Sequence, residues 1–170
     1  MIMLSILQYP DPRLFRKAET VLEVTNQVRE IVLHMAETMY KSAGIGLAAT
    51  QVNIQKRIVV IDISEAKNNL LVLINPKIIW NSNKSKTFQE GCLSIPGIYE
   101  KVTRPESIFC KALDNNGHEY EFNAEGILSV CVQHEIDHLE GTVFLDHLSK
   151  LKRNRIENKL KKIATHSSLS

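Results

Sequence analysis

The feature that most constrains this fold is a helical apolar pattern over residues 125–140 that contains two histidines. His134 and His138 lie four residues apart, so on a helix they point to the same side. Histidine rings inside a buried stripe need partners for their nitrogens. We therefore predict a central, buried helix that ends at Gly141. The same face continues toward its N-terminus through apolar residues, namely Ile127, Val130 and Cys131.

Strand patterns lie between this helix and an earlier one. Apolar spacing and a capping residue, Thr25 or Asn26, predict a helix to Ser42, and a third helix follows over residues 148–163. Segments rich in valine and isoleucine or flanking a turn predict strands at 57–63, 70–74, 107–113 and 118–122. The order predicts an α+β single domain, with antiparallel or mixed β-sheets around the central helix and with N-terminal and C-terminal helices.

Composition narrows the class of protein further. The 170 residues are 44% hydrophobic and 24% charged, as in an ordinary soluble domain, and no apolar stretch approaches the ~20 residues that cross a bilayer. The N-terminus lacks a basic region and a small-residue cleavage site, so we expect no signal peptide and a cytoplasmic protein. The net charge of +2 is too small to indicate a nucleic-acid binder, but seven bases against one acid gather in residues 150–162.

The two histidines belong to a recognised metal-binding pattern. Residues 134–138 read His-Glu-Ile-Asp-His, which matches H-E-x-x-H, and both imidazoles can reach one ion from one helix face. Glu135 flanks that face, where it can handle a proton. A catalytic metal site usually has three protein ligands and one open position. A third ligand is therefore expected from elsewhere in the chain.

Cys92 is the candidate for that third ligand. It lies in Glu90–Gly97, between glycine and proline residues where the backbone can approach a site closely. One thiolate and two imidazoles suit Fe(II), Zn, Co or Ni. The three cysteines do not form a disulfide framework. Cys110 lies in a strand pattern and is expected in the core, and Cys131 is expected in the core or in a pocket wall.

A third segment reads Gly-Ile-Gly-Leu-Ala-Ala-Thr-Gln over residues 44–51. By itself it is typical of a helix end followed by an edge strand, although the Gln51 amide could also donate to an oxyanion. Together, residues 44–51, 90–94 and 133–138 resemble the three motifs of the peptide deformylases, in the same order and without a substitution. The resemblance covers most of the chain.

That resemblance implies the activity and the roles of the site residues. The family removes the formyl group from N-formylmethionine at the start of newly made polypeptides. Its metal ligands correspond to Cys92, His134 and His138, and its catalytic glutamate corresponds to Glu135. Its oxyanion donors correspond to the Gln51 side chain and the Leu93 backbone N–H. Substrate-binding positions correspond to Gly44, Ile45, Gly46, Ile127, Val130 and Cys131.

The same resemblance predicts the surroundings of the site. Glu90 and Arg104 correspond to an acid–base pair that braces the cysteine segment. One Fe2+ per chain is the expected cofactor, and Zn2+, Ni2+ or Co2+ can substitute. Tyr99 stands where some members carry a cleft arginine, so contacts beyond the methionine are expected to differ.

Two regions of the domain are expected to have different roles. Residues 1–148 form the catalytic deformylase part, and residues 149–170 form a basic C-terminal helix whose end, from Thr165, frays. Bacterial deformylases with such a helix suggest ribosome docking, which contacts between basic side chains and phosphates would make salt-dependent. The expected partners are thus N-formylmethionyl nascent peptides and the ribosome, with no membrane.

Two other functions share part of this pattern. A zinc endopeptidase of the H-E-x-x-H type takes a third ligand downstream, and His147 and Glu157 are available by position. A non-enzymatic zinc-stabilised binding module would close its site with four protein ligands. The identity of the third ligand and the absence or presence of a fourth distinguish these alternatives from deformylation.

Overall fold

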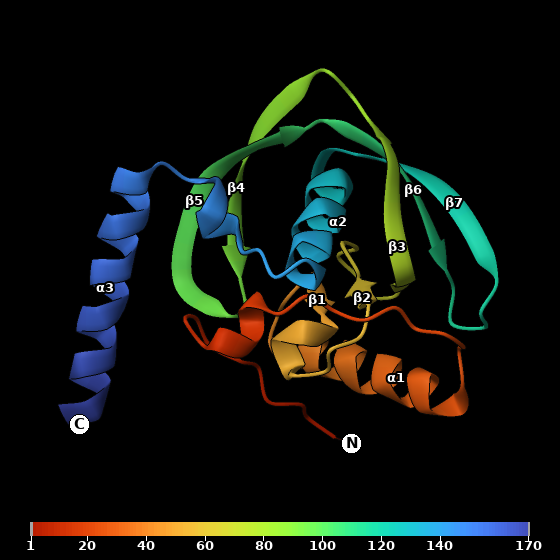
Figure 1. The fold of residues 1–170 in the computed structure, drawn as a ribbon, viewed down its shortest axis with the longest axis horizontal. Coiled ribbons are helices and arrows are strands. Elements are labelled where there is room, and N and C mark those ends of the chain that lie inside the picture. The colour runs from red at the N-terminus through yellow and green to blue at the C-terminus, as the bar shows by residue number, and fades with distance from the viewer. Residues whose placement is uncertain (1, 170) are drawn as a thin grey trace.

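The computed structural model describes residues 2–169 as an α+β domain built around one central helix (Figure 1). That helix is α2 (Gly126–Leu139), with α1 (Asn26–Lys41) before it and α3 (Lys150–Leu169) after it. Short 3-10 helices occur at Pro12–Phe15, Ala49–Val52 and Phe144–His147. The predicted fold class is confirmed, and both sheets are antiparallel. No helix of the described residues is long and apolar enough to cross a membrane.

Within residues 2–169, seven strands form two sheets. A five-stranded sheet has the order β1-β2-β3-β6-β7, and a separate hairpin pairs β4 with β5. The strands of the larger sheet are β1 (Gly46–Ala48), β2 (Ile58–Ile61), β3 (Leu71–Asn81), β6 (Ser107–Leu113) and β7 (Glu119–Glu125). The hairpin strands are β4 (Ser85–Cys92) and β5 (Ile95–Pro105). Residues 46–48 thus form an edge strand after the end of α1, as their sequence favours.

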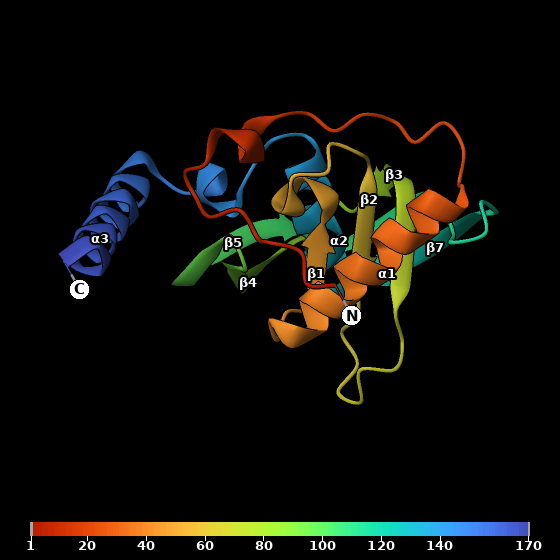
Figure 2. The same cartoon turned by 90° about the horizontal axis from the view of Figure 1, so that it is seen from below.

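Helices cover both faces of the larger sheet, which explains the unbroken apolar run in β2. Val59 and Ile61 pack in the cluster that contains Val132 and Leu139 of α2. Ile58 and Val60, which point to the other face, pack with α1. Figure 2 shows α1 lying across the outer side of this sheet. The α1 boundary agrees with its sequence, because the Thr25 hydroxyl accepts a hydrogen bond from the backbone N–H of Val28 at 3.3 Å.

The β4–β5 hairpin is the main element that sequence patterns did not predict. Its strands pair from Ser85 with Pro105 to Cys92 with Ile95, which leaves only Leu93 and Ser94 in the turn. That turn has no asparagine or glycine, the residues that usually signal a two-residue hairpin turn. The hairpin lies on the opposite side of α2 from β6 and β7 (Figure 1). It therefore carries Cys92 to the central helix.

Helix α3 stands at one side of the domain and packs only along part of its length (Figure 1). Ile156 is buried with Ile98 and Phe144, whereas Leu151 and Ile163 are 71% and 48% exposed. Only some of the apolar residues of this helix are therefore buried against the domain. The sequence predicts fraying from Thr165, but the helix continues to Leu169. Each residue added to a helix contributes one backbone hydrogen bond, which favours its extension. Ser170 lies outside the described residues.

Candidate metal centre and active site

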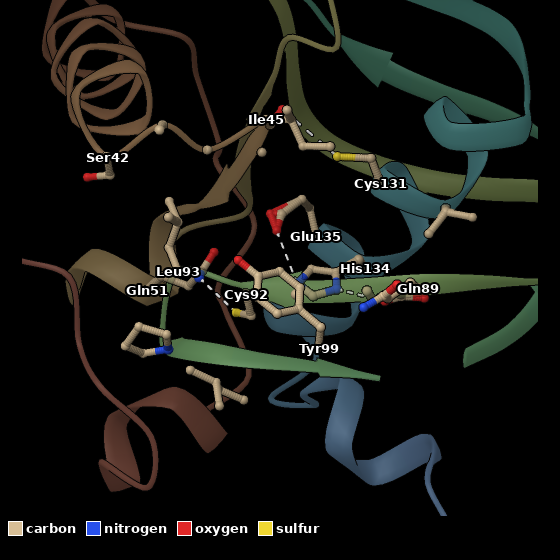
Figure 3. Close-up of a pocket in the computed structure, with 18 of the residues that line it drawn as sticks. Ser42, Ile45, Gln51, Gln89, Cys92, Leu93, Tyr99, Cys131, His134 and Glu135 are labelled. Atoms are coloured by element: carbon tan, nitrogen blue, oxygen red, sulfur yellow. Dashed lines mark hydrogen bonds and ion pairs between the residues drawn. The ribbon is translucent and has the colours of Figure 1, made fainter. Parts of the chain in front are cut away.

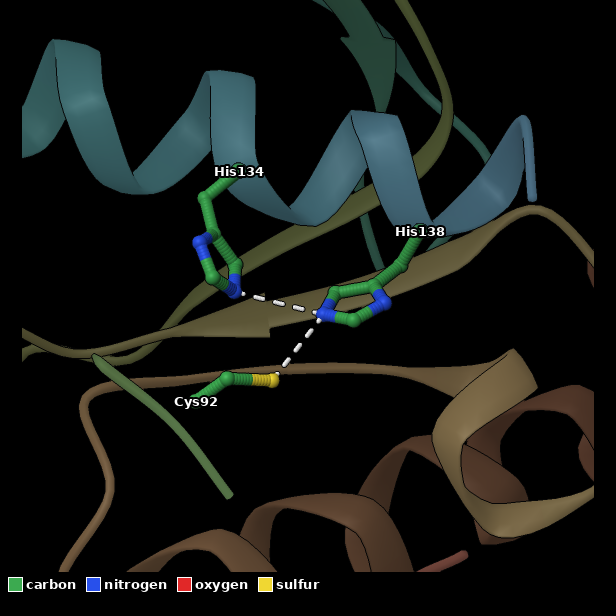
Figure 4. A group of neighbouring side chains, drawn as sticks. All are labelled: Cys92, His134 and His138. Atoms are coloured by element: carbon green, nitrogen blue, oxygen red, sulfur yellow. Dashed lines mark hydrogen bonds between the residues drawn. The ribbon is translucent and has the colours of Figure 1, made fainter. Parts of the chain in front are cut away.

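Three side chains from two distant segments converge beside the middle of α2. The Sγ of Cys92 lies 3.3 Å from Nε2 of His138, and that nitrogen lies 3.2 Å from Nε2 of His134 (Figure 4). One ligand atom from each of the three residues lies within 4.8 Å of the other two. Cys92 arrives on the β4–β5 turn, and the histidines lie one helical turn apart. The expected ligand set is thus brought together.

The donor set fits a tetrahedrally coordinated metal ion. Metal–ligand bonds of about 2.0–2.3 Å at tetrahedral angles separate neighbouring ligand atoms by roughly 3.3–3.6 Å. The observed separations of 3.2 and 3.3 Å are close to this range. Among the described residues, these three form the one group of cysteine, histidine and carboxylate ligands with such spacing. A site with three ligands leaves room for water or substrate, as in catalytic sites.

His134 is oriented by a buried ion pair behind it. Its Nδ1 lies 2.9 Å from Oε1 of Glu90, so the ring donates there and its Nε2 presents a lone pair toward Cys92 and His138. Arg104 donates two hydrogen bonds to Glu90, at 2.6 and 3.0 Å. Burial alone would raise the pKa of Glu90, but the hydrogen bonds from His134 and Arg104 outweigh it and lower the pKa. The predicted Glu90–Arg104 pair is therefore present and holds a ligand in place.

Asp137 and His147 extend this network to the surface. Arg104 Nη1 donates to Oδ2 of Asp137 at 2.9 Å, and Nε2 of His147 lies 2.8 Å from the same oxygen. Sequence reasoning missed the positioning role of both residues and named His147 only as an alternative third ligand. Asp137 lies inside the H-E-x-x-H segment, so the sequence shows a carboxylate there. It does not show the partner, because Arg104 is 33 residues away. His147, one of the alternative third ligands, is thus engaged outside the metal site.

We expect Arg104→Met to destabilise the metal-free protein by about 3–5 kcal/mol, because Glu90 then remains buried without its cationic partner. Arg104 and Glu90 are 5% and 4% exposed, so water does not replace the lost contacts. Urea unfolding in the presence of a chelator measures the change. The double variant Glu90→Gln/Arg104→Met removes the stranded charge and should be more stable than the single variant. A loss below about 1 kcal/mol, as for an exposed ion pair, would contradict this account.

Glu135 lies beside the ligands but faces the cavity. Its Oε1 is 3.7 Å from Nε2 of His134, and its Oε2 is buried with no hydrogen-bond partner among the described residues. Burial raises the pKa of this carboxyl to about 7. A carboxyl group with a pKa near neutrality is matched to accept and return a proton.

The Gln51 amide has only one orientation that satisfies its neighbours. Its Oε1 accepts a hydrogen bond from the backbone N–H of Ala48 at 2.9 Å, so its NH2 group must face the other way. That group donates to Oγ of Ser94 at 3.1 Å and lies 3.4 Å from Sγ of Cys92. A thiol sulfur is a weak acceptor. The amide hydrogen that faces Sγ of Cys92 therefore makes only a weak hydrogen bond. It can donate instead to a stronger acceptor that binds in the cavity.

A cavity of about 600 Å³ opens over these groups (Figure 3). All the predicted substrate-binding residues line it, together with Gln51 and Leu93: Gly44, Ile45, Gly46, Ile127, Val130 and Cys131. Phe88, Gln89 and Tyr99 also line it, and of these only Tyr99 drew attention in the sequence. Gly46 allows β1 to approach α2, since a Cβ there would lie 2.9 Å from Sγ of Cys131.

The residues that would indicate another class of metalloprotein lie elsewhere. Glu157, the other alternative third ligand, accepts hydrogen bonds from Tyr9 at 2.9 Å and from Arg153 at 3.2 Å. Cys110, which the sequence places in the core, is fully buried there and away from the ligands, and burial raises the pKa of its thiol to about 11. No fourth histidine, cysteine or carboxylate of the described residues joins the ligand group. The geometry thus favours neither the endopeptidase nor the closed structural site.

Comparisons with known proteins agree with this geometry. The family model for polypeptide deformylase matches residues 3–154. Peptide deformylase 1 of Burkholderia multivorans is 52% identical over 163 residues, which cover 96% of this chain and 90% of that protein. The crystal structure of a peptide deformylase from Legionella pneumophila has a TM-score of 0.93 and 40% identity, and 99% of each chain is covered. The peptide deformylase of Ehrlichia chaffeensis in complex with actinonin gives a TM-score of 0.91 at 44% identity, over 95% of this chain and 98% of that one. The chain therefore belongs to the polypeptide deformylase family.

Proposed function

We propose that Cys92, His134 and His138 hold the metal with which this peptide deformylase removes the N-formyl group from newly made polypeptides. The products are formate and a free N-terminal methionine. The convergence of three ligand atoms within 4.8 Å, beside the open cavity, is the main support for this assignment. A bound metal ion would lower the pKa of its water ligand from ~15.7 to about 7 and so supply a nucleophile near neutral pH.

Glu135 then acts as the general base and acid. It takes a proton from the attacking water and later delivers it to the leaving amine. Its Oε2 has no hydrogen-bond partner among the described residues, and Glu135 lies beside His134 in the lining of the cavity; both observations support this role. The anchored amide of Gln51 and the backbone N–H of Leu93 donate to the oxygen that becomes negatively charged, a contribution of about 3–4 kcal/mol per donor.

The apolar part of the cavity takes the methionine side chain. Ile45, Ile127, Val130, Cys131 and the ring of His134 line that part. Such a pocket distinguishes side chains by only ~1–3 kcal/mol per methylene group. The pocket for the methionine side chain does not distinguish a formyl from an acetyl group on the substrate's N-terminus. That selectivity has to come from steric crowding next to the metal ligands.

An assay with purified protein tests the whole proposal. Formyl-Met-Ala should yield formate and Met-Ala, whereas internal peptide bonds of a longer unformylated peptide should remain intact. Cleavage of internal bonds would favour the endopeptidase, and neither reaction in metal-loaded protein would favour the binding module.

For the resident metal we propose Fe2+, which the sulfur and nitrogen donor set accommodates. Anaerobic purification followed by metal analysis should find about one iron per chain. Exposure to air should then inactivate the iron form while zinc- or nickel-loaded protein keeps its activity for longer. Equal lifetimes in air would count against an iron enzyme.

We further propose that α3 docks on the ribosome of a cytoplasmic enzyme. Five bases of this helix are exposed and belong to no ion pair of the described residues: Lys150, Arg155, Lys159, Lys161 and Lys162. Because Ile156 is buried, charge reversal is a cleaner test than deletion of residues 150–170. Lys161→Glu/Lys162→Glu should weaken co-sedimentation with ribosomes and flatten its salt dependence. Unchanged co-sedimentation would contradict this role.

A further inference from the structure

A second cavity, of about 290 Å³, lies between β5 and α3 and adjoins the reaction cavity. We call it the β5–α3 groove; it is lined by residues 97–100 of β5 and by Arg155, Ile156 and Lys159 of α3. Gly97 and Tyr99 line both cavities. A polypeptide whose formylated end lies at the metal ligands can therefore continue along β5 into the groove.

The groove carries positive charge that the protein does not neutralise. Arg155 and Lys159 lie four residues apart on α3, so they project to the same side of the helix. Both are exposed, and neither forms an ion pair with any described residue. The one acid in the lining, Glu100, already pairs with Nζ of Lys152 at 3.7 Å. The groove is thus suited to an additional carboxylate.

Tyr99 connects the two cavities with an apolar surface. Its ring packs against the backbone of Gly91, next to Cys92, because a Cβ at position 91 would lie 2.5 Å from Cε1 of the ring (Figure 3). The side chain is nevertheless 64% exposed. Ile156, which is 6% exposed, packs with Ile98 and fixes the helix against this strand. The walls of the groove are therefore held in place on both sides.

We propose that the β5–α3 groove is a further substrate subsite, which binds an acidic side chain of the polypeptide downstream of the formylmethionine. This inference rests on the proposed function, since the formylated end must lie at Cys92, His134 and His138. Arg155 and Lys159 then make this chain prefer nascent polypeptides with an early aspartate or glutamate. Partial exposure limits the size of the preference and makes it sensitive to salt.

A positional scan of formylated peptides tests the subsite. One glutamate, or one glutamine as its neutral isostere, is placed at each of positions 2 to 6 of an otherwise alanine-rich formyl-Met peptide. These positions reach roughly 3–18 Å from the first residue in an extended chain. At one or two positions kcat/KM for formate release should be about fivefold higher with glutamate than with glutamine, and high salt should reduce that ratio.

The variant Arg155→Gln/Lys159→Gln should bring that ratio close to one. The matched variant Lys161→Gln/Lys162→Gln removes the same charge from the same helix, outside the groove, and should keep the ratio. Because the ratio is taken within each enzyme, a general loss of stability or activity cancels.

Three outcomes would overturn the proposal. The first is a glutamate-to-glutamine ratio of kcat/KM near one at every position in the active wild-type enzyme. The second is a ratio in Arg155→Gln/Lys159→Gln that equals the wild-type ratio. The third is that this variant loses co-sedimentation with ribosomes while neither enzyme prefers glutamate in the peptide. The last result would assign these bases to RNA. A wild-type enzyme that releases formate from none of the peptides would instead contradict the proposed function itself.

Discussion

Replacing Glu135 by alanine should remove turnover while the protein keeps its metal. Glu135 is 2% exposed, lines the reaction cavity and lies outside the group of three ligand residues. A positioned general base contributes about 10²–10⁴-fold to a hydrolytic rate. We therefore expect kcat/KM for formyl-Met-Ala to fall by about that factor, with about one metal ion still bound per chain.

Formate release and metal analysis on the same preparation measure both effects. The variant Glu135→Gln keeps the size of the side chain but cannot accept the proton, so it should lose activity to a similar extent. Loss of the metal from Glu135→Ala would mean that Glu135 is a ligand. Activity within tenfold of the wild type would mean that another group handles the proton.

Replacing Cys92 by serine should weaken metal binding by at least the ~10–100-fold that loss of an outer-shell partner costs. Serine is nearly isosteric with cysteine but offers a hard hydroxyl in place of a soft thiolate. Neither of the other two cysteines belongs to the ligand group of the described residues, so no second thiolate stands ready to replace the lost one. Competition with a chromophoric chelator gives the affinity.

Cys110→Ser provides the matched control for that experiment. Cys110 is buried in the core and lies outside the ligand group, so its replacement should lower the free energy of unfolding without changing metal affinity. Equal losses of affinity in the two variants would show that general destabilisation, and not ligation, explains the effect at Cys92. Unchanged affinity in Cys92→Ser would remove the thiol from the proposed site.

Local patterns were sufficient for much of the fold. The Thr25 cap, the helix before Ser42, the hairpin over residues 107–122 and the buried helix over residues 125–140 are all confirmed, because capping and apolar periodicity act within a few residues. The β4–β5 hairpin was missed for the same reason. Its pairing joins residues such as Glu90 and Glu100 through a turn without a sequence signal.

The sequence by itself determined the histidine pair and its glutamate, since spacing along a helix fixes which side chains share a face. It also identified the family through three motifs. The tertiary structure decided which of Cys92, His147 and Glu157 lies beside the two histidines. Local patterns cannot do so, because Cys92 and His138 are 46 residues apart. The same holds for the hydrogen bonds that link Asp137, Arg104 and Glu90 behind His134, and for the groove lined by Tyr99 and Arg155. Both form only when strand register and helix packing bring distant segments together.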